Sequence, residues 1–287
     1  MSLYPLEIFH CKLLGATGGQ LFYLLNLYYN RYLCQQQGEL IMEKQVAIVT
    51  GGTGGIGSAI SRRLAVDYQT VACYFRKGNH DEAKQWQIMQ KKAGFNIEII
   101  YADVSNFEDC ETLISSVKER FGRIDVLVNN AGATSDSSLK NMTPQQWHNI
   151  IDSNLTGVFN MTRNVLPIML EQCHGRIINI SSINGRKGQF GQCNYAATKS
   201  ALYGFSKSLA LEVASKGITV NTISPGYTKT AMLETVKEEI LNEIIANIPV
   251  GRLAKPEEIA AGVAFLASSD AAFITGTNID INGGQYM

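Results

Sequence analysis

The chain has 287 residues, of which 45% are hydrophobic and 17% charged, and its 25 Lys and Arg residues balance its 25 Asp and Glu residues. This length and apolar content suffice to bury the core of one large α/β domain. The zero net charge, without a basic stretch interleaved with aromatic residues, argues against a nucleic-acid-binding surface. We therefore predict no nucleic-acid partner.

The cysteines and histidines give no sign of a metal centre or a disulfide framework. The six cysteines form no C-x-x-C pair, and the four histidines are scattered along the sequence. Structural zinc sites depend on closely spaced ligands, and disulfide scaffolds depend on dense cysteines in an oxidising compartment. We therefore predict no metal ion and a cytoplasmic location.

Residues 1–42 differ in composition from the rest of the chain. They contain an apolar, aromatic run at residues 21–29 followed by a glutamine run at residues 35–37. A bilayer span needs about 20 apolar residues, and a signal peptide needs a basic, an apolar and a small-residue region in turn. Membrane insertion is thus the weaker interpretation, and we predict no membrane partner. We interpret residues 1–42 as an N-terminal extension that is either flexible or not translated in the native protein, because Met42 directly precedes the first predicted strand.

From residue 46 onward, short apolar and β-branched runs alternate with longer segments of helical periodicity. The runs predict seven strands, at residues 46–50, 70–75, 96–101, 126–129, 176–181, 219–223 and 278–281. The longer segments predict helices at residues 56–66, 81–93, 107–121, 144–172, 195–215 and 256–266, with 144–172 breaking into two. This alternation is typical of a parallel sheet with helices on both faces. We predict a single-domain α/β fold over residues 43–287, a doubly wound Rossmann-type fold with a seven-stranded parallel sheet.

A glycine-rich turn joins the first predicted strand to the first predicted helix, where residues 51–57 read GGTGGIG. Phosphate oxygens approach backbone N–H groups closely only where no Cβ intervenes, and a helix N-terminus favours negative charge. The position of this turn, at the first strand of a βαβ series, favours a dinucleotide site over a plain tight connection. The predicted cofactor contacts are Gly51, Thr53, Gly54, Gly55, Ile56 and Gly57.

The end of the second predicted strand indicates which dinucleotide binds. An acidic residue there hydrogen-bonds the ribose of NAD, whereas a cation pairs with the 2′-phosphate of NADP. The sequence has Arg76 and Lys77 at this place. We predict NADPH/NADP⁺ as the cofactor, held by these two side chains, with a solvated loop as the alternative.

Tyr195 and Lys199 begin a predicted helix and project from one face of it, about one turn apart. A free tyrosine has a pKa near 10, and a neighbouring ammonium lowers that pKa by stabilising the phenolate. Ser182 ends an apolar strand at the sheet edge where open α/β folds bind ligands. We predict Tyr195 as an acid–base group with Lys199 as its activator, and Ser182 as a hydrogen-bond partner of the substrate oxygen. An ordinary amphipathic helix is the alternative.

Several motifs in this order resemble the short-chain dehydrogenase/reductase family: the glycine turn, Asn129-Asn130-Ala131-Gly132, Asn154, Ser182, Tyr195 with Lys199, and Pro225-Gly226. The resemblance covers residues 43–287. It implies hydride transfer between a nicotinamide dinucleotide and a ketone or alcohol, and a homotetramer. Ser182 would polarise the carbonyl, Tyr195 would act as the acid, and Lys199 would hold the ribose.

The resemblance also implies that Asn154 anchors a proton-relay water, although a helix cap is an alternative for this residue. The catalytic residues it implies are Asn154, Ser182, Tyr195 and Lys199. The further cofactor contacts it implies are Asp103, Val104, Asn130, Ala131, Gly132, Tyr195, Lys199, Pro225, Gly226 and Thr228. Local turn formation is an alternative for Asp103 and for Pro225-Gly226.

Residues 182–192, 224–227 and 282–284 resemble the acetoacetyl-CoA reductases within that family. This implies an acyl-CoA substrate, reduced with NADPH from a short 3-oxoacyl-CoA to the (R)-3-hydroxyacyl-CoA for polyhydroxybutyrate synthesis. The substrate contacts it implies are Asp136, Ser182, Gln189, Gln192 and Tyr227. Residues 80–83 depart from this group because they are less basic than expected.

Two alternative functions remain. A reductase of 3-oxoacyl groups on the acyl carrier protein runs the same chemistry and needs a cationic patch, which Arg186 and Lys187 supply. A catalytically inactive dinucleotide sensor would keep the fold and lose the catalytic groups. The complete set of Ser182, Tyr195 and Lys199 argues against the sensor.

Overall fold

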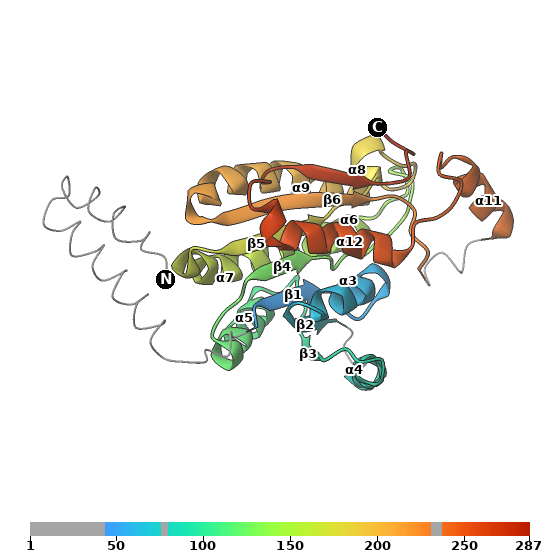
Figure 1. Cartoon of the computed structure of the whole chain (residues 1–287). Coiled ribbons are helices and arrows are strands. Elements are labelled where there is room, and N and C mark those ends of the chain that lie inside the picture. Colours follow the sequence, from blue (N-terminus) through green and yellow to red (C-terminus); the bar gives the residue numbers. More distant parts are fainter. Residues whose placement is uncertain (1–43, 76–79, 231–236) are drawn as a thin grey trace, which may run out of the picture. The chain divides into compact units, whose positions relative to one another are not determined.

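The computed structural model describes residues 44–75, 80–230 and 237–287. Its seven strands form one parallel sheet in the order β3-β2-β1-β4-β5-β6-β7 (Figure 1). The strands are β1 (Val46–Thr50), β2 (Gln69–Tyr74), β3 (Ile97–Tyr101), β4 (Val126–Asn129), β5 (Gly175–Ile180), β6 (Ile218–Pro225) and β7 (Asn278–Ile281). The predicted fold is confirmed. The predicted extension at residues 1–42 lies outside the described residues.

Helices cover both faces of the sheet. On one face α3 (Gly55–Ala65) and α12 (Pro256–Ala267) lie side by side, and on the other α5 (Phe107–Phe121), α7 (Gly157–Gln172) and α9 (Cys193–Val213) pack together. Alternate residues of β1 serve the two cores, with Val46 and Ile48 in one and Ala47 and Val49 in the other. Because successive side chains of a strand point to opposite faces, a strand covered on both sides is an unbroken apolar run.

The segment predicted as two helices remains helical throughout. It consists of α6 (Pro144–Ile151), a π-helical turn η1 (Asp152–Thr156), and α7. A capping box between Thr143 and Gln146 starts α6. The expected break is thus a widened turn rather than a loop. Such π turns often occur at functional sites.

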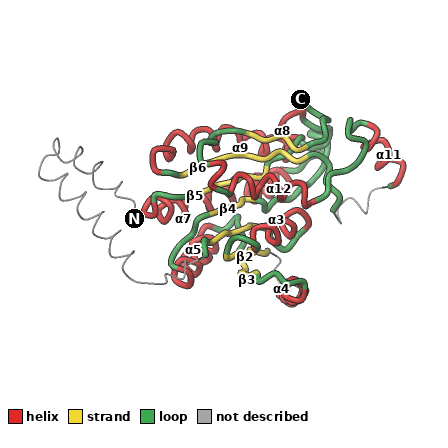
Figure 2. The backbone as a smooth tube through the Cα atoms, viewed as in Figure 1, coloured by secondary structure: helices red, strands yellow, loops and turns green. Residues whose placement is uncertain are grey.

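Two short helices were not predicted from the sequence. They are α8 (Asn184–Lys187) and α11 (Glu238–Ala246), which follow β5 and β6. Figure 2 shows α8 among the loops at the carboxyl edge of the sheet. The remaining described elements are α4 (His80–Lys92), η2 (Ala214–Lys216) and η3 (Ser269–Ala271). None of the described helices combines the length and the hydropathy that crossing a bilayer requires.

Candidate active site

The glycine turn forms a cradle that side chains would fill. Gly51 has a φ of 61°, a left-handed conformation that favours glycine. A Cβ on Gly52 would lie 2.8 Å from the Cβ of Ala72, and a Cβ on Gly57 would collide with the carbonyl oxygen of Gly51. In the described segment 44–75, α3 begins at Gly55 with no acidic side chain in its first turn and no side-chain cap. Its first N–H groups are therefore available to an anion, as a dinucleotide phosphate requires.

A clasp of hydrogen bonds joins the ends of β1 and β4 beside this cradle. The hydroxyl of Thr50 accepts from the backbone N–H groups of Asn130 and Ala131, each at 2.9 Å. The amide of Asn130 donates back to the carbonyl oxygens of Thr50, at 2.9 Å, and Gly51, at 3.3 Å. The clasp holds the predicted contacts Asn130 and Ala131 against the glycine turn. The role of Thr50 was not predicted, because it depends on the pairing of β1 with β4.

The structure brings Ser182, Tyr195 and Lys199 together. The Ser182 hydroxyl lies beside the Tyr195 phenol, whose pKa it lowers as a hydrogen-bond donor, and it accepts from the N–H of Asn184 at 3.1 Å. Nζ of Lys199 lies 5.6 Å from the centre of the Tyr195 ring and donates to the carbonyl oxygen of Ile180 at 2.8 Å. The strand β5 ends at Ile180, so Ser182 lies just beyond the strand rather than within it.

The electrostatics of this cluster differ from the sequence-based expectation. Burial raises the pKa of Tyr195 above 10, and the hydrogen bond from Ser182 opposes that rise only in part. Burial lowers the pKa of Lys199 to about 8. The expected lowering of the tyrosine pKa by Lys199 is therefore not found, because the desolvation of the phenolate dominates. Tyr195 is a protonated acid at neutral pH, and Lys199 is charged only below about pH 8.

Asn154 lies in η1 and is completely buried. Its Oδ1 accepts from the N–H of Ala133 at 2.8 Å and from the Ser153 hydroxyl at 2.7 Å, while its Nδ2 donates to the carbonyl oxygen of Ala133 at 2.9 Å. A Cβ on Gly132 would lie 3.4 Å from both Asn154 Oδ1 and Lys199 Nζ, so these groups are close neighbours. Asn154 therefore lies inside a helical turn and bonds to the loop at Ala133, and it does not cap a helix.

The remaining predicted cofactor contacts lie at the ends of β3 and β6. Both the N–H and the hydroxyl of Ser105 donate to the carboxylate of Asp103, so Asp103 does form a local turn. Val104 is buried beside it. Gly226 and Thr228 follow β6, and the Thr228 hydroxyl donates to the carbonyl oxygen of Gly226 at 3.1 Å. The predicted phosphate contacts Arg76 and Lys77 lie outside the described residues.

The predicted substrate contacts are only partly brought together. Gln192 links Asp136 to Asn184, since its Nε2 donates to the Asp136 carboxylate at 2.8 Å and its Oε1 accepts from the Asn184 amide at 2.9 Å. The Asp136 charge raises the pKa values of both Tyr195 and Tyr227, which places it near both rings. Gln189 instead accepts from the exposed Lys187 at 3.1 Å. Neither Asn184 nor this link was predicted.

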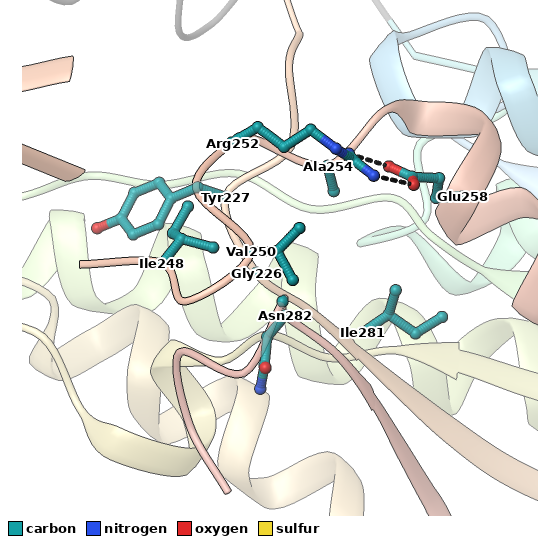
Figure 3. Close-up of a pocket in the computed structure, with 10 residues that line it drawn as sticks. Gly226, Tyr227, Ile248, Val250, Arg252, Ala254, Glu258, Ile281 and Asn282 are labelled. Atoms are coloured by element: carbon teal, nitrogen blue, oxygen red, sulfur yellow. Dashed lines mark hydrogen bonds and ion pairs between the residues drawn. The ribbon is translucent and has the colours of Figure 1, made fainter. Parts of the chain in front are cut away.

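A pocket of about 130 Å³ lies next to Tyr227, and its wall includes Ile248 and Val250 (Figure 3). Arg252 and Glu258 form a bidentate ion pair at its side, with N–O distances of 2.7 and 2.8 Å. This pair lowers the pKa of Glu258 to about 2. Within residues 44–75, 80–230 and 237–287, no group of three or more His, Cys, Asp or Glu side chains is arranged to hold a metal ion.

Comparison with known proteins identifies the family. Residues 51–285 match a family model described as enoyl-(acyl carrier protein) reductase. The chain belongs to the short-chain dehydrogenase/reductase family, as the resemblance predicted. It is accordingly an oxidoreductase that uses a nicotinamide dinucleotide.

Individual members of this family show which proteins the chain is similar to. The chain is 53% identical to an acetoacetyl-CoA reductase of Shinella zoogloeoides over 245 residues, which is 85% of this chain and 99% of that protein. It is 48% identical to an acetoacetyl-CoA reductase of Allochromatium vinosum over 243 residues, again 85% of this chain and 99% of that protein. It is 42% identical to a 3-oxoacyl-[acyl-carrier-protein] reductase of Vibrio cholerae over 246 residues, 86% of this chain and 99% of that protein.

The lowered pKa of Lys199 predicts an alkaline limit to the reduction reaction. Because Lys199 loses its charge as pH rises through about 8, it then ceases to stabilise the developing Tyr195 phenolate, and kcat falls above this pH. The measurement is kcat from pH 6 to pH 10, with samples returned to pH 7 to exclude irreversible unfolding. A kcat that stays constant up to pH 10 would contradict the role given to the Lys199 charge.

Proposed function

We propose that the chain reduces acetoacetyl-CoA, a short 3-oxoacyl-CoA, to the (R)-3-hydroxyacyl-CoA with NADPH, and that the product feeds polyhydroxybutyrate synthesis. The observation that carries the proposal is the hydroxyl pair of Ser182 and Tyr195 beside Lys199, at the sheet edge that also holds the glycine cradle. Four relatives named acetoacetyl-CoA reductase, at 46% to 53% identity, support the choice of substrate.

The geometry suits a reduction in which acid and electrophile are separate residues. The dinucleotide supplies the hydride. The Ser182 hydroxyl donates a hydrogen bond to the carbonyl oxygen of the substrate, and the Tyr195 phenol transfers its proton to that oxygen as negative charge develops there. Burial keeps Tyr195 protonated until that moment. The ammonium of Lys199 then lies close enough to stabilise the phenolate and to bind the ribose.

Asn154, Asp136 and Gln192 have supporting roles in this proposal. Asn154 fixes the loop at Ala133 next to Lys199, and from there it holds the proton-relay water. Asp136 and Gln192 form a polar rim together with Tyr227, and this rim orients the thioester part of the substrate.

The structure bears on the choice between a CoA thioester and a carrier-protein thioester. In the alternative function the substrate is attached to an acidic carrier protein, which would bind to free cations at the entrance of the active site. Arg186 is engaged within the chain, since its guanidinium lies 3.7 Å from Asp280 and over the rings of Tyr203 and Tyr286. Both residues of the expected patch are exposed, and Lys187 donates to Gln189 at 3.1 Å. The pairing of Arg186 with Asp280 weakens the cationic patch of the carrier-protein alternative, while the preference for CoA rests on the names of the relatives.

Four further proposals rest on the sequence and the family. NADP is the preferred dinucleotide, held by Arg76 and Lys77, because no acidic residue follows β2 before Asp81 in the sequence. The protein forms a homotetramer through its long helices, which is consistent with the exposed Phe159 on α7 and Leu211 on α9. The cytoplasmic location and the N-terminal extension stay predictions.

A direct assay tests the proposed substrate. We expect NADPH oxidation with acetoacetyl-CoA at a kcat/KM at least about tenfold above that with acetoacetyl-acyl carrier protein, which corresponds to a difference of about 1.4 kcal/mol. Comparable values for both thioesters would remove the preference for CoA. Turnover of neither would support a dinucleotide sensor.

The acid role of Tyr195 is tested by Tyr195→Phe. General acid catalysis contributes about 10²- to 10⁴-fold, so kcat falls by at least about 10² while NADPH binding is retained. Stopped-flow reduction gives the rate, and NADPH fluorescence titration gives the dissociation constant. A loss of only a few-fold would refute the role.

The proposed NADP preference is tested by Arg76→Glu. A carboxylate beside the 2′-phosphate repels it, so the ratio of kcat/KM for NADPH to that for NADH drops by at least about tenfold. Lys84→Glu on the exposed side of α4 is the matched control, because it makes the same charge change where no phosphate contact is predicted. An unchanged ratio in Arg76→Glu would show that the assignment is wrong.

A further inference from the structure

Tyr203 lies on α9 about two turns after Tyr195, on the side that faces the active site. Its hydroxyl donates to the backbone carbonyl oxygen of Ser182 at 3.2 Å. The same hydroxyl lies 2.9 Å from the hydroxyl of Ser224, which donates to the side chain of Asn278 at 2.7 Å. A chain of hydrogen bonds thus runs from β7 through the end of β6 to Ser182.

The two hydrogen-bond partners of the Tyr203 hydroxyl constrain the position of its ring. Each hydroxyl has a single proton to give. The Tyr203 hydroxyl has two partners, the Ser182 carbonyl oxygen and the Ser224 hydroxyl, and in the second contact either hydroxyl can donate. The phenol oxygen lies within hydrogen-bonding distance of both partners, so small rotations of the ring would break one of the contacts.

Arg186 holds the Tyr203 ring in this position. The guanidinium carbon lies 5.6 Å from the centre of the Tyr203 ring and 5.4 Å from the centre of the Tyr286 ring. Its Nη2 lies 3.7 Å from a carboxylate oxygen of Asp280 on β7. Each of these contacts is weak by itself. Together they fix the guanidinium from two sides against Tyr203.

The anchored carbonyl belongs to the residue whose hydroxyl meets Tyr195. The Ser182 carbonyl oxygen accepts from Tyr203 and from the N–H of Gly185 at 3.0 Å, while the Ser182 hydroxyl accepts from the N–H of Asn184. Ser182 lies just past the end of β5, but the backbone around it is still paired with β6, since the N–H groups of Ser181 and Ile183 donate to carbonyl oxygens of β6 at 2.7 and 2.9 Å. The hydrogen bond from Tyr203 adds a hold on the carbonyl group of Ser182 itself, and so on the peptide unit from which its hydroxyl projects.

We propose that Tyr203 is a positioning residue, which holds Ser182 in hydrogen-bonding register with Tyr195. Tyr203 contacts neither the substrate nor the dinucleotide in this proposal, and it acts only through Ser182. The proposal rests on the proposed role of Ser182 in the reduction. It extends the site to a residue that the catalytic motif does not contain.

The test is Tyr203→Phe, which removes the hydroxyl and keeps the ring that Arg186 contacts. We expect kcat to fall by about fivefold, the size expected for one hydrogen bond, with the KM for NADPH unchanged. In the Ser182→Ala background the same change has no further effect on kcat, because the group it positions is absent. An equal fold-loss in both backgrounds, or no loss in the wild-type background, would overturn the proposal.

Tyr68→Phe is the matched control. The Tyr68 hydroxyl also donates to a backbone carbonyl, that of Ala267 at 2.9 Å, but it packs in the core on the α3 and α12 face. The change therefore removes a hydrogen bond of the same kind with no link to Ser182. We expect kcat to remain at the wild-type value in Tyr68→Phe.

Amide hydrogen exchange gives a readout that does not depend on turnover. We expect Tyr203→Phe to speed exchange at residues 183–188, where Asn184 and Gly185 donate to Ser182, and Tyr68→Phe to leave it unchanged. If the wild-type protein reduces no 3-oxoacyl thioester, the proposed function fails. The exchange rates of Tyr203→Phe and Tyr68→Phe would still show whether Tyr203 holds the segment at Ser182. Unchanged exchange in Tyr203→Phe would overturn the proposal.

Discussion

The reversal of strand order between β1 and β4 is the constraint on which the site depends. The chain first builds outward to β3 and then returns to the other side of β1, the switch in strand order at which open α/β sheets form a ligand-binding crevice. Thr50 and Asn130 close the base of that crevice with reciprocal hydrogen bonds. Because all strands are parallel, the glycine turn and the segments after β5 and β6 open onto the same edge. The cofactor cradle and the acid–base groups are neighbours for this topological reason.

Desolvation dominates the electrostatics of the site. It shifts Tyr195 and Lys199 towards their neutral forms, raising the pKa of the first and lowering that of the second. A protonated tyrosine suits reduction, in which the residue must give a proton away. The lysine need not ionise the tyrosine beforehand, since its charge is useful chiefly once the phenolate has formed. The pair is therefore arranged to stabilise charge during the reaction rather than before it.

The sequence patterns predicted the sheet well because each strand is a buried apolar run, and burial on both faces leaves a strong local signal. The short helix α8 and the π turn at Asn154 carry no such signal, since contacts with other elements stabilise them. The pKa of Tyr195 was expected to fall because a sequence shows its charged neighbour but not its burial. Arg186 is exposed, as a surface cation should be, but its contacts with Tyr203, Asp280 and Tyr286 could not be predicted because these partners are distant in the sequence.

The extra residue in the π turn η1 also determines where the Asn154 side chain points. A π turn holds one residue more than an α-helical turn of the same rise, so η1 fits an extra residue between α6 and α7 without shifting either helix. Deleting that residue would turn η1 into an ordinary α-helical turn and leave α6 and α7 in place, but it would change the direction in which the Asn154 side chain points. Asn154 would then leave Ala133, and the loop after β4 would lose its hold on α9. The extra residue of the π turn is therefore required by the contacts of Asn154 rather than by the packing of α6 and α7.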